Sequence, residues 1–281
     1  MVNYGRSAVN AQLASAVVRI NSANELPFKD VLSSDHFSNE FASACLNYRE
    51  RIFPPQTTLL AFMAQALCPD HSCQQAVLRV NAERAVNGLK LASADTAAYC
   101  KARGRLPENL LHKLVCESGQ HLERAVPSEW LWNKRHVKLI DGSCVSMPDT
   151  KENQLEYPQH SGQKPGLGFP IARIAGVLSL AFGTVLDLAI GPCKGKQTGE
   201  HALLRQLLHC FKKGDIALAD AYYCSYFLIA ALQQIGVDIV SRKHGARNCD
   251  FRRGKRLGKG DHLVTYCRPK RKSSVCPAFH S

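Results

Sequence analysis

The periodicity of the sequence changes near residue 135, and this change constrains the fold more than any other feature of the chain. After it, three segments read as strands because they alternate in polarity or are rich in β-branched residues: 136–147, 172–182 and 184–192. Gly183 lies between the second and third segments and marks a tight turn. Because tight turns join antiparallel strands, these segments predict an antiparallel meander.

Two amphipathic helices alternate with strands in the next part of the chain. Leucines line one helical face of segment 198–214, where we expect Thr198 to cap the start and Gly214 to end the helix. A strand, a helix and a strand follow at 215–223, 225–234 and 237–243. The order β-β-β-α-β-α-β predicts an α/β (α+β) fold, a ribonuclease-H-like mixed sheet flanked by helices.

Three regions of different pattern predict the domain organisation. Residues 1–130 read as short helices, such as 59–67, and predict a helical N-terminal domain that either binds DNA or only covers a core. Residues 131–245 contain the strands and helices described above and predict a partial ribonuclease-H-like core. Residues 246–281 are basic and glycine-rich, which predicts the start of a β-rich insertion.

The net charge of +13 is concentrated in one segment of the chain. Residues 241–272 contain twelve Lys and Arg against two Asp, so this segment alone carries +10. Each Lys or Arg set against a phosphate releases condensed counterions, so a block of this charge favours a nucleic-acid partner. The alternative is a solvated loop that binds nothing.

The twelve cysteines are scattered through apolar segments without the spacing of a disulfide framework. This usage indicates reduced thiols and a cytoplasmic protein. Cys68 and Cys73 lack the C-x-x-C spacing of a zinc site. The apolar stretches are too short to span a membrane and the N-terminus lacks a signal-peptide pattern, so we expect no membrane partner.

Two aspartates have the setting that metal-dependent phosphate chemistry requires. Asp141 follows the apolar run at 137–140, and Asp220 ends the strand that begins at Asp215. Two-metal phosphoryl transfer needs carboxylates that converge on two divalent ions about 4 Å apart. Asp215 lies roughly 16 Å from Asp220 along the strand, so we expect it to be a turn residue. We expect Asp187 to be a solvated position on an edge strand.

Four long blocks of the sequence resemble the DDE transposases of bacterial insertion sequences, specifically the insertion-sequence-four group. In chain order the blocks are FPPQTTLLAFMAQ (53–65), DGSCVSMPDTKENQLEYPQHSGQKPGLGFP (141–170), GDIALADAYYCSYFLI (214–229) and HGARNCDFRRGKRLGKGDHLVTY (244–266). The resemblance therefore covers most of the chain from residue 53 onward.

The resemblance implies a ribonuclease-H-like catalytic domain, interrupted by a β-rich insertion, whose DDE triad binds two Mg²⁺ ions. The first two family aspartates fall on Asp141 and Asp220, which are then catalytic residues and metal ligands. The third family ligand is a glutamate beyond the insertion, within a Tyr-Arg-Glu-Lys signature, but no glutamate follows Glu200. We therefore expect that the chain lacks its C-terminal part, that the two-metal site is incomplete and that this chain is inactive alone.

The resemblance also assigns DNA contacts. The basic residues expected to contact DNA are Lys164, Arg242, Lys243, His244, Arg247, Arg252, Arg253, Lys255 and Arg256. Such phosphate contacts position a duplex without reading its sequence. A polar loop that contains Tyr157, Gln159, Ser161, Gln163 and Lys164 either contacts DNA near the scissile phosphate or braces the first two strands.

The function that follows is that of an insertion-sequence transposase, which binds DNA and performs Mg²⁺-dependent strand cleavage and transfer during transposition. Its partners would be double-stranded DNA, as element ends and target, and a second copy of the chain in a homodimer on paired ends. The protein would be cytoplasmic and nucleoid-associated when bound to DNA. The alternative is a non-catalytic, DNA-binding remnant of a transposase.

Overall fold

The structure is a computed structural model that describes residues 35–45, 48, 51–160, 162, 164, 166–195, 198–244, 252, 254–259 and 261–266 of the 281-residue chain. The chain divides into two compact units, Met1–Leu114 and Val115–Ser281. The functional domain boundaries expected after residues 130 and 245 stay predictions.

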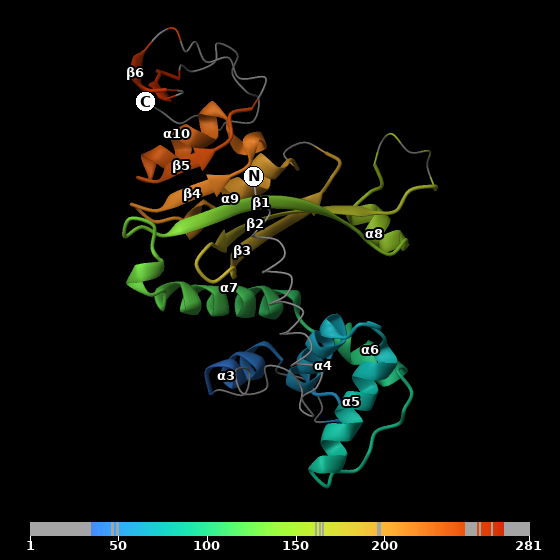
Figure 1. Ribbon diagram of the computed structural model, residues 1–281. Coiled ribbons are helices and arrows are strands. Elements are labelled where there is room, and N and C mark those ends of the chain that lie inside the picture. Colours follow the sequence, from blue (N-terminus) through green and yellow to red (C-terminus); the bar gives the residue numbers. More distant parts are fainter. Residues whose placement is uncertain are drawn as a thin grey trace. The chain divides into compact units, whose positions relative to one another are not determined.

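The described residues of the first unit form packed helices. These are α3 (Asp35–Ala44), α4 (Pro55–Leu67), α5 (Cys73–Val86), α6 (Ala97–Arg103) and the beginning of α7 (Glu108–Arg124) (Figure 1). Pro55 starts α4, where its missing N–H costs no helical hydrogen bond. Ser72 caps α5 by accepting a hydrogen bond from the Gln75 N–H. The predicted helix at 59–67 is confirmed as part of α4, and the other described helices confirm the helical character of this part of the chain.

The second unit contains a five-stranded mixed sheet in the order β3-β2-β1-β4-β5 (Figure 1). Its strands are β1 (Val137–Ser146), β2 (Ile171–Ser179), β3 (Val185–Pro192), β4 (Ile216–Ala219) and β5 (Asp238–Ser241). The first three pair antiparallel as a meander, whereas β4 pairs parallel with both β1 and β5. This topology confirms the predicted ribonuclease-H-like fold.

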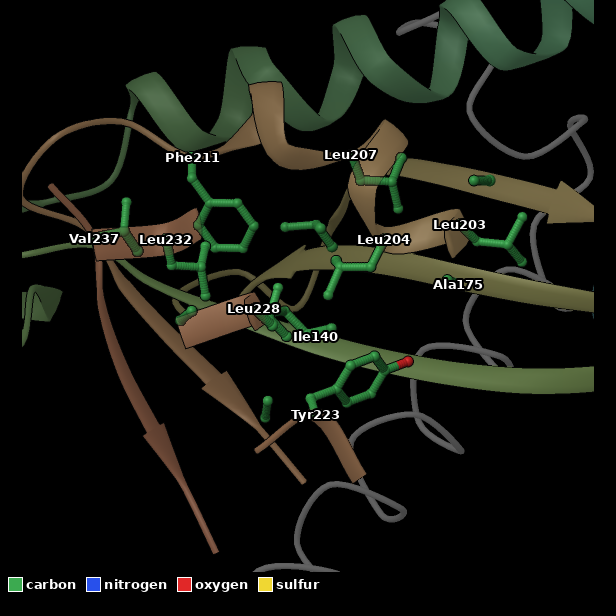
Figure 2. Packing of buried hydrophobic residues seen from close by; sticks show 14 of the residues in the cluster. Ile140, Ala175, Leu203, Leu204, Leu207, Phe211, Tyr223, Leu228, Leu232 and Val237 are labelled. Carbon is green, nitrogen blue, oxygen red and sulfur yellow. The ribbon is translucent and has the colours of Figure 1, made fainter. Parts of the chain in front are cut away.

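Two short helical segments and α10 (Tyr226–Gln234) cover the sheet with apolar side chains. The segments are α9 (Glu200–Gln206) and the 3₁₀ helix η2 (Leu208–Cys210). Figure 2 shows buried residues of α9 and α10 and the two that flank η2, together with Ile140 of β1: Leu203, Leu204, Leu207, Phe211, Leu228 and Leu232. On α7, an added Cβ at Gly119 would lie 2.0 Å from the Val185 carbonyl oxygen, so the helix contacts the start of β3 at van der Waals distance.

The helix predicted over residues 198–214 is shorter than expected. Thr198 does not cap it: the residue before α9 is Gly199, and the Thr198 hydroxyl donates to the Gly195 carbonyl. At the other end, the His209 ring lies 2.9 Å from the Gln206 carbonyl oxygen through Nδ1. This oxygen would accept from the residue 210 N–H in a continued α-helix, but that N–H bonds to Leu207 instead. The chain therefore tightens into η2.

A buried ion pair joins β1 to the start of β4. Lys138 is 3% exposed, and its Nζ lies 2.5 Å from Asp215 Oδ2 and 2.7 Å from the Cys210 carbonyl oxygen. Asp215 Oδ2 also accepts from the Lys212 N–H at 2.7 Å. Asp215 was expected to be only a turn residue; the structure corrects this, because its carboxylate neutralises a lysine that β1 carries into the core.

The basic part of the chain contributes a separate two-stranded antiparallel sheet. Its strands are β6 (Lys255–Gly258) and β7 (Asp261–Leu263). This pair lies in the region where a β-rich insertion was predicted to start. Among the described residues, no helix has the length and apolar character to cross a membrane.

Candidate active site

Asp141 lies at the point where β1 continues past the end of β4. The parallel pairing of these strands ends at Ile140 and Ala219, and Asp141 and Asp220 are the next residues on each chain segment. Neighbouring strands lie about 4.8 Å apart, so the two aspartates lie side by side at the same end of these two strands. Both residues are exposed, whereas Ile140 and Ala219 before them are buried.

Each aspartate is oriented by a nearby backbone N–H. Asp141 Oδ1 accepts from the Gly142 N–H at 2.8 Å. Asp220 Oδ1 accepts from the Tyr222 N–H at 2.9 Å and so caps the 3₁₀ helix η3 (Ala221–Tyr223). In both aspartates this backbone hydrogen bond is made by Oδ1 and not by Oδ2.

A third carboxylate, which sequence reasoning missed, lies beside this pair. Glu200 is the first residue of α9, and its Oε2 accepts from the Tyr223 hydroxyl at 3.1 Å. An added Cβ at Gly142 would lie 2.8 Å from Glu200 Cδ and 2.9 Å from the Tyr223 hydroxyl oxygen. Only a glycine after Asp141 leaves space for this arrangement.

Tyr223 links the three carboxylates to the core. Its ring is buried in the apolar cluster beside Ile140 (Figure 2). Burial, followed by the negative charges of Glu200, Asp141 and Asp220, raises the pKa of the Tyr223 hydroxyl above its ordinary value. The hydroxyl therefore keeps its proton and remains a donor to Glu200.

Oxygen donors of this kind suit Mg²⁺, which binds through one or two carboxylates together with waters and phosphate oxygens. The residues present thus fit a divalent ion of hard character. In the described part of the chain, the groups of three metal-ligand atoms that lie within 4.8 Å of one another are found elsewhere, so these carboxylates are spread more widely.

The predicted DNA-contacting residues that the structure describes are exposed. They are Lys164, Arg242, Lys243, His244, Arg252, Lys255 and Arg256. Arg247 and Arg253 lie outside the described residues. Ala219 pairs with Ser241 in the parallel strands β4 and β5, so Arg242 follows beside Asp220 at the same end of the strands.

The polar loop after β1 is braced by one of its own side chains. Gln159 Nε2 donates to the Lys164 carbonyl at 2.8 Å, and its Oε1 accepts from the Gly166 and Gly168 N–H groups at 3.2 Å. These bonds lie within the loop, so both predicted roles, contact with DNA and bracing of the first two strands, stay predictions. Ser161 and Gln163 lie outside the described residues.

Comparison with known proteins adds a family to this geometry. The family model described as "Transposase DDE domain" matches residues 132–274. Transposase InsG for insertion sequence element IS4, from Escherichia coli (strain K12), is 27% identical over 241 residues, which cover 82% of this chain and 52% of InsG. The chain thus spans about half the length of this relative.

One solved structure is also similar, at a much greater distance. It is the cryo-EM structure of a piggyBac transposase synaptic complex with hairpin DNA, with 11% identity and a TM-score of 0.36 over 82% of this chain and 53% of that one. A similarity at this level supports no inference about the chain.

Proposed function

This chain belongs to the DDE transposase family, in its insertion-sequence-four group. We propose that Asp141 and Asp220, at the ends of the β1–β4 pairing, serve Mg²⁺-dependent cleavage and transfer of DNA strands. The observation that carries the proposal is the parallel register of β1 and β4, which ends one residue before each aspartate. Two carboxylates that far apart in sequence become neighbours only through this pairing.

Asp141 and Asp220 would hold the metal ions, with their backbone hydrogen bonds fixing the starting orientation. Bound Mg²⁺ would activate the attacking oxygen and stabilise the leaving oxygen of the phosphodiester. Glu200 adds negative charge beside the pair and is held in place by Tyr223. We assign Glu200 the role of a positioning residue, because its contacts are to Tyr223 and to the backbone next to Asp141.

The exposed basic residues that follow β5 would hold the DNA. Arg242 begins this segment at the strand end beside Asp220, so bound phosphates would lie next to the carboxylates. Their contacts would position the duplex rather than read it. The natural partner is then double-stranded DNA at element ends and at the target, with a homodimer on paired ends as a further expectation.

The test is nicking of an element-end duplex by this chain with Mg²⁺ or Mn²⁺, in parallel with DNA binding at several salt concentrations. We expect salt-dependent binding and nicking that is weak or undetectable, because the family's later glutamate has no counterpart after Glu200. Any nicking should be abolished in D141N and in D220N while DNA binding persists. Metal-dependent nicking that survives both substitutions would disprove the assignment.

DNA binding without nicking in any metal, and without Mn²⁺ binding at Asp141 and Asp220, would instead favour the non-catalytic, DNA-binding remnant. In favour of that second candidate, the ligand atoms of Asp141, Asp220 and Glu200 do not all lie within 4.8 Å of one another in this conformation. Mn²⁺ binding measured by electron paramagnetic resonance separates the two, since only the catalytic candidate requires it.

A further inference from the structure

Four metal-ligating side chains meet at the β3 edge of the sheet, away from the aspartate pair. They come from three elements of the second unit: Cys116 of α7, Asp187 of β3, and His209 and Cys210 of η2. We call this group the β3-edge cluster. Ligand atoms of Asp187, His209 and Cys210 all lie within 4.8 Å of one another, and Cys116 Sγ lies within 4.8 Å of an Asp187 carboxylate oxygen.

Asp187 is the centre of the cluster and is buried. It is 6% exposed, which corrects the expectation that it is a solvated edge position. Its Oδ1 accepts from the Leu188 N–H at 2.6 Å, and its Oδ2 lies 2.9 Å from His209 Nε2. A buried carboxylate needs hydrogen-bond donors or positive charge nearby, and the His209 ring faces its Oδ2.

Both nitrogens of the His209 ring face acceptors. Nδ1 lies 2.9 Å from the Gln206 carbonyl oxygen, and Nε2 lies 2.9 Å from Asp187 Oδ2. A neutral ring has a single N–H and can satisfy only one of them. A cation bound at Nε2 would satisfy both this nitrogen and the Asp187 oxygen beside it. Donation from the other nitrogen to a backbone carbonyl is the arrangement that orients metal-binding histidines.

The two thiols make the cluster suitable for a soft cation. Cys210 Sγ lies 3.8 Å from His209 Nε2. With Zn–S of about 2.3 Å and Zn–N of about 2.0 Å, tetrahedral coordination separates these two ligand atoms by about 3.5 Å, close to the spacing found. Burial raises the pKa of both thiols to about 12, so without a cation they stay protonated.

We propose that Cys116, Asp187, His209 and Cys210 form a structural site for one Zn²⁺ ion, which ties α7 and η2 to the edge strand β3. Asp187, His209 and Cys210 bring their ligand atoms within 4.8 Å of one another, and Cys116, beside Asp187, would move in as the fourth ligand that a structural zinc site requires. The donors also differ in kind from the all-oxygen aspartate pair, which suits Mg²⁺. The site is thus independent of the proposed DNA chemistry.

The experiment is a Co²⁺ titration of the full chain after removal of metals by chelation, followed by displacement with Zn²⁺. We expect one Co²⁺ per chain to show the visible absorption of tetrahedral cobalt and a thiolate-to-cobalt charge-transfer band in the near ultraviolet, whereas Co²⁺ at the all-oxygen aspartate pair would lack that band. Zn²⁺ should displace it. C210S and H209Q should weaken binding more than about 100-fold, beyond the effect of losing an outer hydrogen-bond partner.

The matched controls are C224S, which changes a half-buried thiol outside the cluster, and D141N, which changes the aspartate pair. Both should develop the same thiolate-to-cobalt band as the unaltered chain at the same Co²⁺ concentration. If C210S fails to fold, H209Q remains informative because the His209 side chain is 60% exposed. Absence of the thiolate-to-cobalt band, or a band unchanged in H209Q, would overturn the proposal, as would loss of the band in D141N.

Discussion

The carboxylates of the second unit occupy two contrasting environments. Asp141 and Asp220 are exposed at the ends of parallel pairing, where solvent and incoming ligands reach them. Asp187 and Asp215 are buried, and each is held against a basic side chain of the protein, His209 or Lys138. Exposure to solvent, rather than the mere presence of an acidic residue at a strand end, thus separates a carboxylate available for chemistry from one that is paired with a basic side chain and stabilises the fold.

Removal of the exposed carboxylates should have the largest effect, on metal binding. D141N and D220N should each abolish Mn²⁺ binding, because each removes one of the two charged ligands proposed for the same ions. E200Q should weaken it only about tenfold, in the range found for groups that act through a ligand. Mn²⁺ electron paramagnetic resonance measures all three. Equal effects of E200Q and D141N would show that Glu200 is itself a ligand.

Removing the partner of a buried carboxylate should affect stability instead. K138M leaves the Asp215 charge in the core without its lysine, which should lower the free energy of unfolding by about 3 to 5 kcal/mol. The double variant K138M/D215N should recover part of the loss. Urea denaturation gives both values. A K138M chain as stable as the original would mean that Asp215 is not held as a buried charge.

Crowding next to the exposed pair sharpens the comparison. G142A places a Cβ 2.8 to 2.9 Å from Glu200 and Tyr223 and should cost about 1 to 3 kcal/mol of stability through overpacking. Its control is G176A, directly opposite Asp141 on β2, where the nearest atom is 3.7 Å away. Thermal unfolding should separate the two. Equal melting temperatures would show that Glu200 moves aside without cost.

The smallest expected effect is a pH dependence of the metal-free chain at the β3-edge cluster. The pKa of the Cys210 thiol is raised to about 12, mainly by burial, above the ordinary value of about 8.5. Between these values the folded state binds the proton more firmly than the unfolded state, so stability falls as pH rises through this window. Urea denaturation at several pH values should show a shallower fall in C210S. An unchanged slope would contradict the assignment.

The sheet and its aspartates were predictable because they depend on local pattern. Alternation and turns predicted the meander, and the apolar runs before Asp141 and Asp220 predicted where pairing would bring them together. Glu200 was not predictable as a neighbour of Asp141, because it arrives from α9 through tertiary packing at Gly142. Only its position just before a helical leucine pattern could have drawn attention to it.

The errors have the same physical origin. Asp187 alternates with apolar residues like a solvated strand position, and Asp215 follows a glycine like a turn residue. The basic groups brought by η2 and β1 favour their burial. The early end of the 198–214 helix likewise depends on the His209 ring at the Gln206 carbonyl. A sequence pattern specifies neighbours within an element but not the polar partners that other elements supply.

The parallel pairing of β1 with β4 has one last consequence, for the order of events during folding. Asp141 precedes β2, β3 and α9 in the chain, while Asp220 follows them, so an unfolded polypeptide holds the two acids far apart. A divalent ion that prefers both together binds only the finished sheet and stabilises it by mass action. A higher Mn²⁺ concentration should then slow unfolding. The metal ion would thereby report whether the chain has formed the pairing of β1 with β4.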